Sequence, residues 1–208
     1  IAVTVTLACL IGCTLLLFAG WELIIIGALC VLFAFLYTTG PYPLSYNGWG
    51  DVLVIIFFGF VPVGGTYYVQ ALTWTPDVTI ASIICGLLID TLLVVNNYRD
   101  READARSGKR TVIVRFGEKF GRYFYLLLGI SASLLCLYFL REGHIYAALL
   151  PQLYLVPHVL TWRRMVKIHS GKKLNSILGE TSRNMLFMGI LLAIGRFFEN
   201  EIIPHLIT

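Results

Sequence analysis

The feature that most constrains this chain is a series of apolar segments, each about long enough to cross a lipid bilayer. A spanning helix needs about 20 mostly apolar residues, and seven stretches approach that length. They are expected at residues 1–18, 21–37, 52–72, 77–97, 121–140, 144–162 and 182–198. This pattern predicts an all-α fold, a polytopic transmembrane helix bundle in which residues 1–208 form a single membrane domain.

Composition excludes an ordinary soluble domain. The chain is 58% apolar and only 13% charged, whereas soluble domains are about half apolar and about a quarter charged. The cysteines all lie inside apolar segments, which indicates core or lipid-facing side chains and neither a disulfide framework nor a zinc site. They are Cys9, Cys13, Cys30, Cys85 and Cys136. The chain begins inside an apolar run and without Met, so the sequence also suggests a missing N-terminal part.

Basic residues gather in the connections that follow the 77–97 and 144–162 segments. These two connections hold 14 of the 16 Lys and Arg residues: Arg99, Arg101, Arg106, Lys109, Arg110, Arg115, Lys119, Arg122, Arg163, Arg164, Lys167, Lys172, Lys173 and Arg183. The positive-inside rule places both connections on the cytoplasmic side. With seven spans, the connection between residues 37 and 52 and the start of the chain lie at the same face.

The stretch from 96 to 111, NNYRDREADARSGKRT, concentrates acidic and amide side chains after an apolar segment. On a helix, Asn97, Asp100 and Asp104 stand at i, i+3 and i+7 and share one face. Two carboxylates beside amide oxygens offer the hard oxygen ligands that Mg²⁺ prefers. The sequence therefore predicts a metal-binding set made of these three residues.

Basic residues accompany the predicted metal ligands. Gly108 is expected to end the helix, and Lys109 and Arg110 follow it directly. With Arg101, they are candidate ligands for a phosphate group. Acids that bind a metal and bases that bind phosphate, placed at a membrane surface, indicate a lipid diphosphate. The alternative is a solvated loop whose charges only set the topology.

The connection from 37 to 51, YTTGPYPLSYNGWGD, is rich in Pro and Gly, which predicts an ordered turn instead of a helix. Tyr37, Tyr42 and Tyr46 are candidate hydroxyl donors for a phosphate or an aromatic acid. They equally suit an interfacial aromatic belt, and the residues alone leave both interpretations open.

The 52–72 segment carries residues that alter helix geometry. Gly59, Gly64 and Gly65 favour close helix packing over the alternative, a groove for an isoprenoid tail. Pro62 is expected to kink the helix.

A few polar side chains lie deeper or at segment ends. Asp90 falls on the face of the predicted metal ligands, about two turns deeper, where it either supports those ligands or bonds a neighbouring helix. His158 is interpreted as a helix-contact histidine. Glu180, Thr181 and Arg183 are weaker candidates for facing the site from the start of the last segment.

Together these stretches resemble the UbiA-type intramembrane prenyltransferases, most closely the 1,4-dihydroxy-2-naphthoate polyprenyltransferase branch. The motifs that carry the resemblance are YTTGPYPLSYNGWGD followed by FFG, GGTYYVQ, and NNYRDREADARSGKRTVIVRFG. The resemblance implies nine membrane helices around a cavity open to lipid, seven of them in this chain. It also implies two Asp-rich motifs on cytoplasmic connections. Asn97, Asp100 and Asp104 match the second. The first, Asn-Asp-x-x-x-Asp, is absent from residues 1–208, which implies that two helices and half of the metal site are missing.

By the same resemblance, the function is Mg²⁺-dependent transfer of a polyprenyl group from polyprenyl diphosphate to 1,4-dihydroxy-2-naphthoate. CO₂ and diphosphate are lost and demethylmenaquinone forms, with Asp100 and Asp104 as the catalytic residues. The expected location is the bacterial inner membrane, with the Asp-rich loop in the cytoplasm and no nucleic acid as partner. The alternatives are a related prenyltransferase with another aromatic acceptor and a non-catalytic lipid-binding membrane protein.

Overall fold

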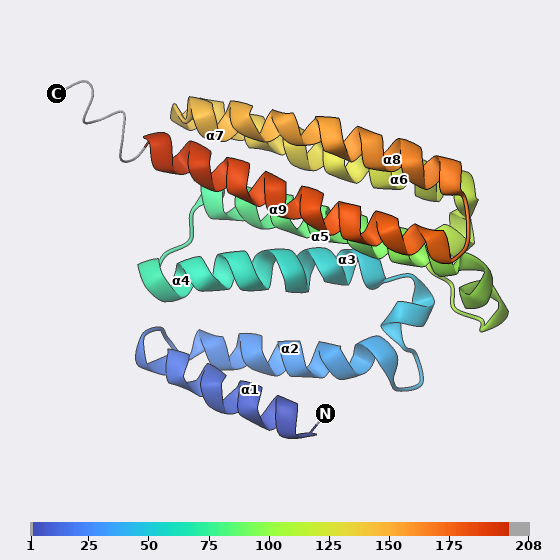
Figure 1. The fold of residues 1–208 in the computed structure, drawn as a ribbon. Coiled ribbons are helices and arrows are strands. Elements are labelled where there is room, and N and C mark those ends of the chain that lie inside the picture. Colours follow the sequence, from blue (N-terminus) through green and yellow to red (C-terminus); the bar gives the residue numbers. More distant parts are fainter. Residues whose placement is uncertain (1, 200–208) are drawn as a thin grey trace.

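Helical segments run back and forth along one direction in the computed structural model, which describes residues 2–199 (Figure 1). The elements in chain order are α1 (Ala2–Thr14), η1 (Leu15–Leu17), α2 (Glu22–Thr38), η2 (Leu44–Asn47), α3 (Gly50–Val54), η3 (Ile55–Gly64), α4 (Gly65–Ala71), α5 (Pro76–Arg106), α6 (Val112–Leu135), η4 (Cys136–Glu142), α7 (Ile145–Leu149), η5 (Leu150–Tyr154), α8 (Leu155–Ile168), η6 (Lys172–Leu174) and α9 (Asn175–Phe197). The described part of the chain contains no strand, and the predicted all-α membrane fold is confirmed.

Each predicted apolar segment has a helical counterpart, but their number as membrane spans is not confirmed. Within the described residues, four helical stretches are long and apolar enough to cross a bilayer: Gly50–Ala71, Pro76–Arg106, Val112–Glu142 and Lys172–Phe197. Val3–Leu17 and Glu22–Thr38 are shorter apolar helices. Seven spans therefore remain a prediction.

The start of α6 corrects a predicted boundary. A helix was expected from residue 121, but α6 begins at Val112, where the Thr111 hydroxyl accepts a hydrogen bond from the Val114 backbone N–H at 3.3 Å. Gly117, with φ of +87°, interrupts the helical geometry soon afterwards. The apolar pattern could not reveal this start, because capping and not hydropathy determines it. The last helix likewise begins earlier than expected, at Asn175 instead of residue 182.

The central element is α5, which packs against η3 on one side and α6 on the other. A Cβ atom added at Gly59 would lie 2.4 Å from the Ser82 carbonyl oxygen, and one at Gly86 would lie 2.9 Å from Ile55 Cα. These glycines therefore allow η3 and α5 to approach closely, as the sequence predicts for Gly59. Gly64 has the Trp74 ring against it, whereas Gly65 has nothing within 4 Å, so the packing interpretation of Gly65 is wrong.

Pro62 lies in η3, a ten-residue π-helical stretch. Proline lacks a backbone N–H and cannot complete the α-helical hydrogen-bond pattern. The departure from α-helical geometry occurs in the segment where the sequence predicts a kink, but it is a π-helical stretch instead.

The long helix α5 carries the predicted site beyond the apolar part of the bundle. Pro76 stands at its start, and the Thr75 hydroxyl accepts a hydrogen bond from the Val78 N–H at 3.4 Å. With 31 residues, the helix is about 46 Å long at 1.5 Å per residue. A bilayer core is about 30 Å thick, so the last turns project past it. The helix ends before Gly108, whose φ is +76°, as predicted.

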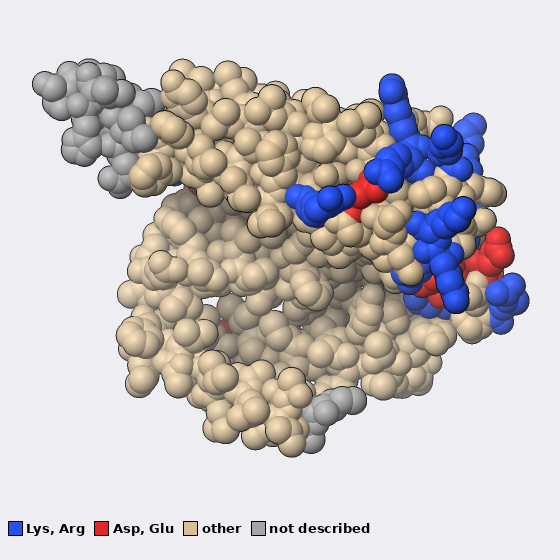
Figure 2. All heavy atoms as spheres, in the orientation of Figure 1, with Lys and Arg blue, Asp and Glu red and all other residues tan. Residues whose placement is uncertain are grey.

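Charged side chains gather at one end of the molecule. Figure 2 shows Lys, Arg, Asp and Glu gathered where the α5–α6 and α8–α9 connections lie, while most of the rest of this face is uncharged and hollowed. The α2–α3 connection lies at the same end of the molecule (Figure 1). The three connections share one end, as the charge distribution predicts. This end carries the candidate site.

Candidate functional site

The three predicted metal ligands lie on α5 in different surroundings. Asn97 and Asp104 are buried, with exposed fractions of 4% and 9%. Asp100 is more exposed and forms an ion pair with Arg99 at 2.6 Å. Asp104 lies 3.4 Å from the Lys109 ammonium. Each carboxylate therefore has a cation from its own segment beside it.

Arg99, which the sequence reasoning missed, ties this end of α5 to α9. Its guanidinium donates to Asp100, to the Asn96 Oδ1 at 2.6 Å and to the Asn175 Oδ1 at 2.9 Å. Such charge-assisted bonds fix the Asp100 side chain. Only its position next to Asp100 could have signalled this role, because Asn175 is far away in the sequence.

A small polar cavity brings together residues of the α2–α3 and α5–α6 connections and of the helices beside them. Its volume is about 10 Å³, and its lining consists of Tyr37, Ser45, Gly48, Gly50, Asp51, Asn97, Lys109 and Thr111. Three of these residues are predicted site residues: Tyr37, Asn97 and Lys109. Asp51 was missed, because a single acid at the start of an apolar segment is not distinctive in a sequence.

Backbone contacts hold the α2–α3 connection in place, and the predicted ordered turn is present. The Ser45 hydroxyl donates to the Tyr37 carbonyl at 2.6 Å, and the Arg110 N–H donates to the Tyr46 carbonyl at 2.8 Å. Arg115 donates to the Asn47 carbonyl at 2.7 Å. These bonds clamp the connection onto the segment that follows α5.

Not every predicted phosphate or substrate ligand reaches this cavity. The side chains of Tyr42 and Tyr46 are exposed by 57% and 42% and do not line it. Arg110 also has an exposed side chain and contributes its backbone instead. The structure does not group these three side chains with the site, since sequence proximity alone does not determine where a side chain points.

Arg101 belongs to a separate network. Its guanidinium lies 4.6 Å from the Tyr98 ring centre, donates to the Tyr98 carbonyl at 2.7 Å, and lies 3.4 Å from Glu118. Glu118 also pairs with Arg122 and with His169. Arg101 thus joins α5 to α6 and does not line the polar cavity.

The deeper polar residues of α8 and α9 form helix contacts. His158 is buried, with its Nδ1 at 2.9 Å from the Tyr154 hydroxyl and its Nε2 at 3.2 Å from the Leu126 carbonyl. This agrees with the helix-contact interpretation. Glu180 pairs with Arg164 at 2.8 Å, and the Thr181 hydroxyl lies 3.0 Å from that of Tyr125. These contacts commit Glu180 and Thr181 to helix packing, contrary to the expectation that they face the site.

The exposed side chain of Arg183 likewise does not line the polar cavity.

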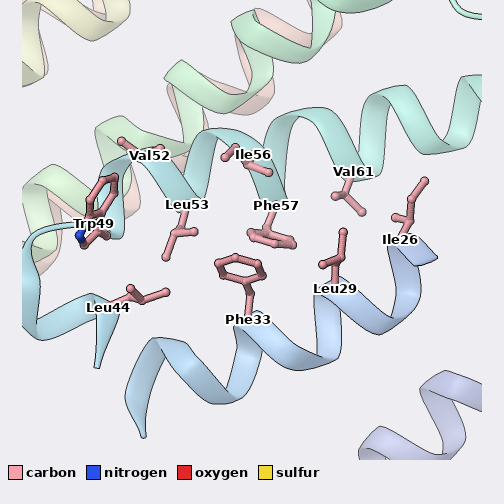
Figure 3. Close-up of a pocket in the computed structure, with 10 residues that line it drawn as sticks. All are labelled: Ile26, Leu29, Phe33, Leu44, Trp49, Val52, Leu53, Ile56, Phe57 and Val61. Atoms are coloured by element: carbon pink, nitrogen blue, oxygen red, sulfur yellow. The ribbon is translucent and has the colours of Figure 1, made fainter. Parts of the chain in front are cut away.

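A second cavity, of about 510 Å³, is apolar (Figure 3). It lies between α2 and the α3–η3 segment, and its lining consists of Ile26, Leu29, Phe33, Leu44, Trp49, Val52, Leu53, Ile56, Phe57 and Val61. Phe33 and Phe57 face each other across it, with ring centres 5.2 Å apart. Different residues of the 44–53 segment line the two cavities, so this one segment borders both an apolar and a polar space.

The donor set fits a hard cation completed by phosphate. Within residues 2–199, no three His, Cys, Asp or Glu side chains converge on a common point. Mg²⁺ is usually held by only one or two carboxylates together with substrate phosphates. Asp100 and Asp104, which already have basic groups beside them, are therefore suited to a site that a diphosphate completes.

Comparison with known proteins agrees with this chemistry. The UbiA prenyltransferase family model matches residues 1–191. The chain is 39% identical over 141 residues to the 1,4-dihydroxy-2-naphthoate octaprenyltransferase of Escherichia coli strain K12, covering 65% of this chain and 46% of that protein. It is 33% identical over 194 residues to the protein of the same description from Mycobacterium leprae, covering 92% of this chain and 64% of that protein.

The chain spans about half the length of the curated relatives it matches. No solved structure gives a significant match. The family model covers nearly the whole chain, and the resemblance in the sequence motifs is thereby confirmed. The chain belongs to the UbiA prenyltransferase family.

Proposed function

We propose that the protein transfers a polyprenyl group from polyprenyl diphosphate to 1,4-dihydroxy-2-naphthoate. CO₂ and diphosphate leave, and the product is the hydroquinone form of demethylmenaquinone. The observation that carries the proposal is that one segment, residues 44–53, lines both a large apolar cavity and a small polar cavity near the charged end of the bundle. The printed names of the relatives support this donor and this acceptor.

The apolar cavity suits the prenyl tail. All ten of its lining side chains are apolar or aromatic, and burial of an isoprenoid chain against them removes apolar surface from water. The segment from Leu44 to Leu53 that borders it also contributes residues to the polar cavity. A tail held there would place its diphosphate end among the polar groups.

The polar end suits the diphosphate. Lys109, which lies beside Asp104 near the end of α5, supplies a positive charge for phosphate oxygens that bind at this end of the helix. Asp100 and Asp104 would hold Mg²⁺, which neutralises charge on the leaving diphosphate when bound. Arg99 keeps Asp100 oriented while the basic groups bind phosphate.

The reaction exchanges one bond for another. The bond between the allylic carbon and the diphosphate oxygen breaks, and diphosphate keeps the electron pair. The ring carbon that bears the carboxylate attacks the allylic carbon, and loss of CO₂ returns the electrons of its bond to the ring. The apolar walls exclude water, which would otherwise capture the allylic cation.

The proposed setting is the bacterial inner membrane, with residues 1–208 as part of one membrane domain and the charged end in the cytoplasm. The clustering of Lys and Arg at that end supports this orientation.

The test is prenyl transfer by an Asp100→Asn variant of the purified protein in liposomes. Labelled polyprenyl diphosphate and 1,4-dihydroxy-2-naphthoate are the substrates, and the labelled product is measured with Mg²⁺ present. We expect product formation to fall at least about 100-fold, since a charge that holds the metal is lost. The matched control is Asp77→Asn, which removes a carboxylate from the opposite end of α5.

Wild-type turnover in Asp100→Asn would contradict the assigned role of this residue. A covalent product only with another aromatic acceptor would reassign the acceptor, and no covalent product with any acceptor would favour a lipid-binding protein.

A further inference from the structure

Asp51 places a carboxylate in the polar cavity from the side opposite α5. It stands in the first turn of α3, its exposed fraction is only 7%, and it lines the cavity together with Tyr37 and Asn97. Within residues 2–199 it forms no salt bridge. A buried carboxylate without a cation is costly, so this position favours either a proton or a positively charged ion beside it.

Asp90 adds a second carboxyl group directly behind Asp51. The packing of α3 and η3 on α5 is antiparallel, with Gly50 against Leu93 and Ile55 against Gly86. This register brings Asp51 next to Asp90, and their carboxyl groups lie beside each other. Asp90 is completely buried, and in the described part of the chain no N–H or hydroxyl donor reaches its carboxyl oxygens, so its hydrogen-bonding neighbour is the Asp51 carboxyl group.

The two adjacent acids need a positive charge between them, which is either a shared proton or a bound cation. Two adjacent buried carboxylates repel each other. The ammonium of Lys109, which lines the same cavity, lies 3.4 Å from Asp104 and forms a salt bridge there. A bound cation would offset the repulsion between Asp51 and Asp90 and satisfy their oxygens.

The size of the cavity restricts its occupant. Its volume of about 10 Å³ is close to the space that one water-sized particle occupies. An aromatic acceptor or a phosphate group does not fit, but a single metal ion does. The surrounding carboxylate, amide and phenol oxygens are the hard ligands that Mg²⁺ or Mn²⁺ prefers.

We propose that this cavity is a divalent-cation site in which Asp51 and Asn97 are the ligands, with Tyr37 beside them. Asp90 supports Asp51 from behind and is a positioning residue. The inference deepens the proposed function and rests on it only for the purpose of the ion, which would add positive charge beside Lys109. Binding of the ion itself does not depend on prenyl transfer.

The proposal changes the role of Asn97. Asn97 and Asp104 are seven residues apart, which is about 10.5 Å along a helix. One ion cannot readily contact both side chains. Asn97 therefore binds the cavity ion together with Asp51 across the α3–α5 contact. Asp100 and Asp104 bind a separate ion nearer the end of α5.

The experiment measures Mn²⁺ binding to the purified protein in detergent, without any substrate, by electron paramagnetic resonance titration. We expect Asp51→Asn to lose one Mn²⁺ site or to weaken it at least about 100-fold. Asp90→Asn should weaken the same site about 10- to 100-fold, the usual effect of removing a group that supports a ligand. Asp100→Asn should retain this site, and the control Asp77→Asn should bind as the wild type does.

A second measurement, of the unfolding temperature, distinguishes loss of the ion site from poor folding of a variant. Mn²⁺ should raise the unfolding temperature of the wild type and should raise it less in Tyr37→Phe, which removes one oxygen from the lining. Wild-type Mn²⁺ binding by Asp51→Asn would overturn the proposal. Absence of Mn²⁺ binding by the wild type would also overturn it and would leave water as the occupant.

The two proposals fail separately. Loss of prenyl transfer in Asp100→Asn together with unchanged Mn²⁺ binding in Asp51→Asn would retain the proposed function and remove the cavity site. An Mn²⁺ site lost in Asp51→Asn, together with no covalent product from any acceptor, would retain the site and remove the function.

Discussion

The helices α2 and α5 are both largely apolar, yet they lie in opposite surroundings. No residue of α2 is buried, whereas buried residues follow α5 from Val78 to Asp104. Gly86 on α5, Gly59 on η3 and Gly121 on α6 let these helices approach closely, while α2 is separated from α3 and η3 by the apolar cavity. In a bilayer, lipid covers apolar side chains as well as a protein does, so hydrophobicity alone does not bring helices together.

This difference suits the two sides of the molecule to different kinds of ligand. The packed helix α5 holds the polar groups at defined distances, which the binding of a metal or a phosphate requires. The wall formed by α2 borders open apolar space, which suits a flexible chain. Three experiments test this contrast.

The largest expected effect is on stability, from substitution of a glycine at the packed contact. In Gly59→Ala, the new Cβ would lie 2.4 Å from the Ser82 carbonyl oxygen, so backbone must shift. We expect a loss of about 1–3 kcal/mol in the free energy of unfolding, as overpacked contacts show. The measurement is denaturant unfolding in detergent.

The matched control is Gly27→Ala on α2, where a Cβ would meet nothing within 4 Å. This change should be neutral or slightly stabilising, since Ala favours a helix over Gly by up to about 1 kcal/mol. Equal losses at both positions would show that α2 is as tightly packed as α5.

A smaller effect is expected on substrate preference, from narrowing the apolar cavity. Phe57→Trp enlarges a ring that faces Phe33 across the cavity. If the prenyl tail lies there, turnover with a long polyprenyl diphosphate should fall about tenfold relative to geranyl diphosphate, a typical scale for changes in apolar pockets. The control is Phe58→Trp, an exposed neighbour outside the lining. An equal fall for both donors would argue against a tail in this cavity.

The smallest effect is expected from a hydrogen bond between packed helices. Thr181→Val removes the hydroxyl that lies 3.0 Å from the buried Tyr125 hydroxyl and should lower the free energy of unfolding by about 1 kcal/mol. Thr39→Val is the comparison at the end of α2, where the exposed hydroxyl bonds the Phe35 carbonyl. That change should stay within about 0.5 kcal/mol. A larger loss at Thr39 than at Thr181 would reverse the contrast.

Helical periodicity predicts the site residues on α5, but it does not predict which residues of the connections lie beside them. The i, i+3, i+7 spacing places Asn97, Asp100 and Asp104 on α5, and Gly108 ends the helix where the sequence indicates. The same reasoning gives no orientation for residues in the connections. It could not show that Lys109 turns into the cavity while the Arg110 side chain remains exposed, because long-range contacts determine this difference.

By itself, the sequence determined the helical membrane fold, the sharing of one end by the charged connections, and the family. These features can be predicted because the length of an apolar segment, the position of charges and the spacing of a motif are each properties of a single stretch of sequence. Only the tertiary structure decided that Asp51 and Asp90 lie together and that Asn97 joins them. It also decided that α2 leaves an apolar cavity while α5 is tightly packed. These features depend on how the surfaces of two helices pack together, and the sequence of one helix alone does not determine that packing.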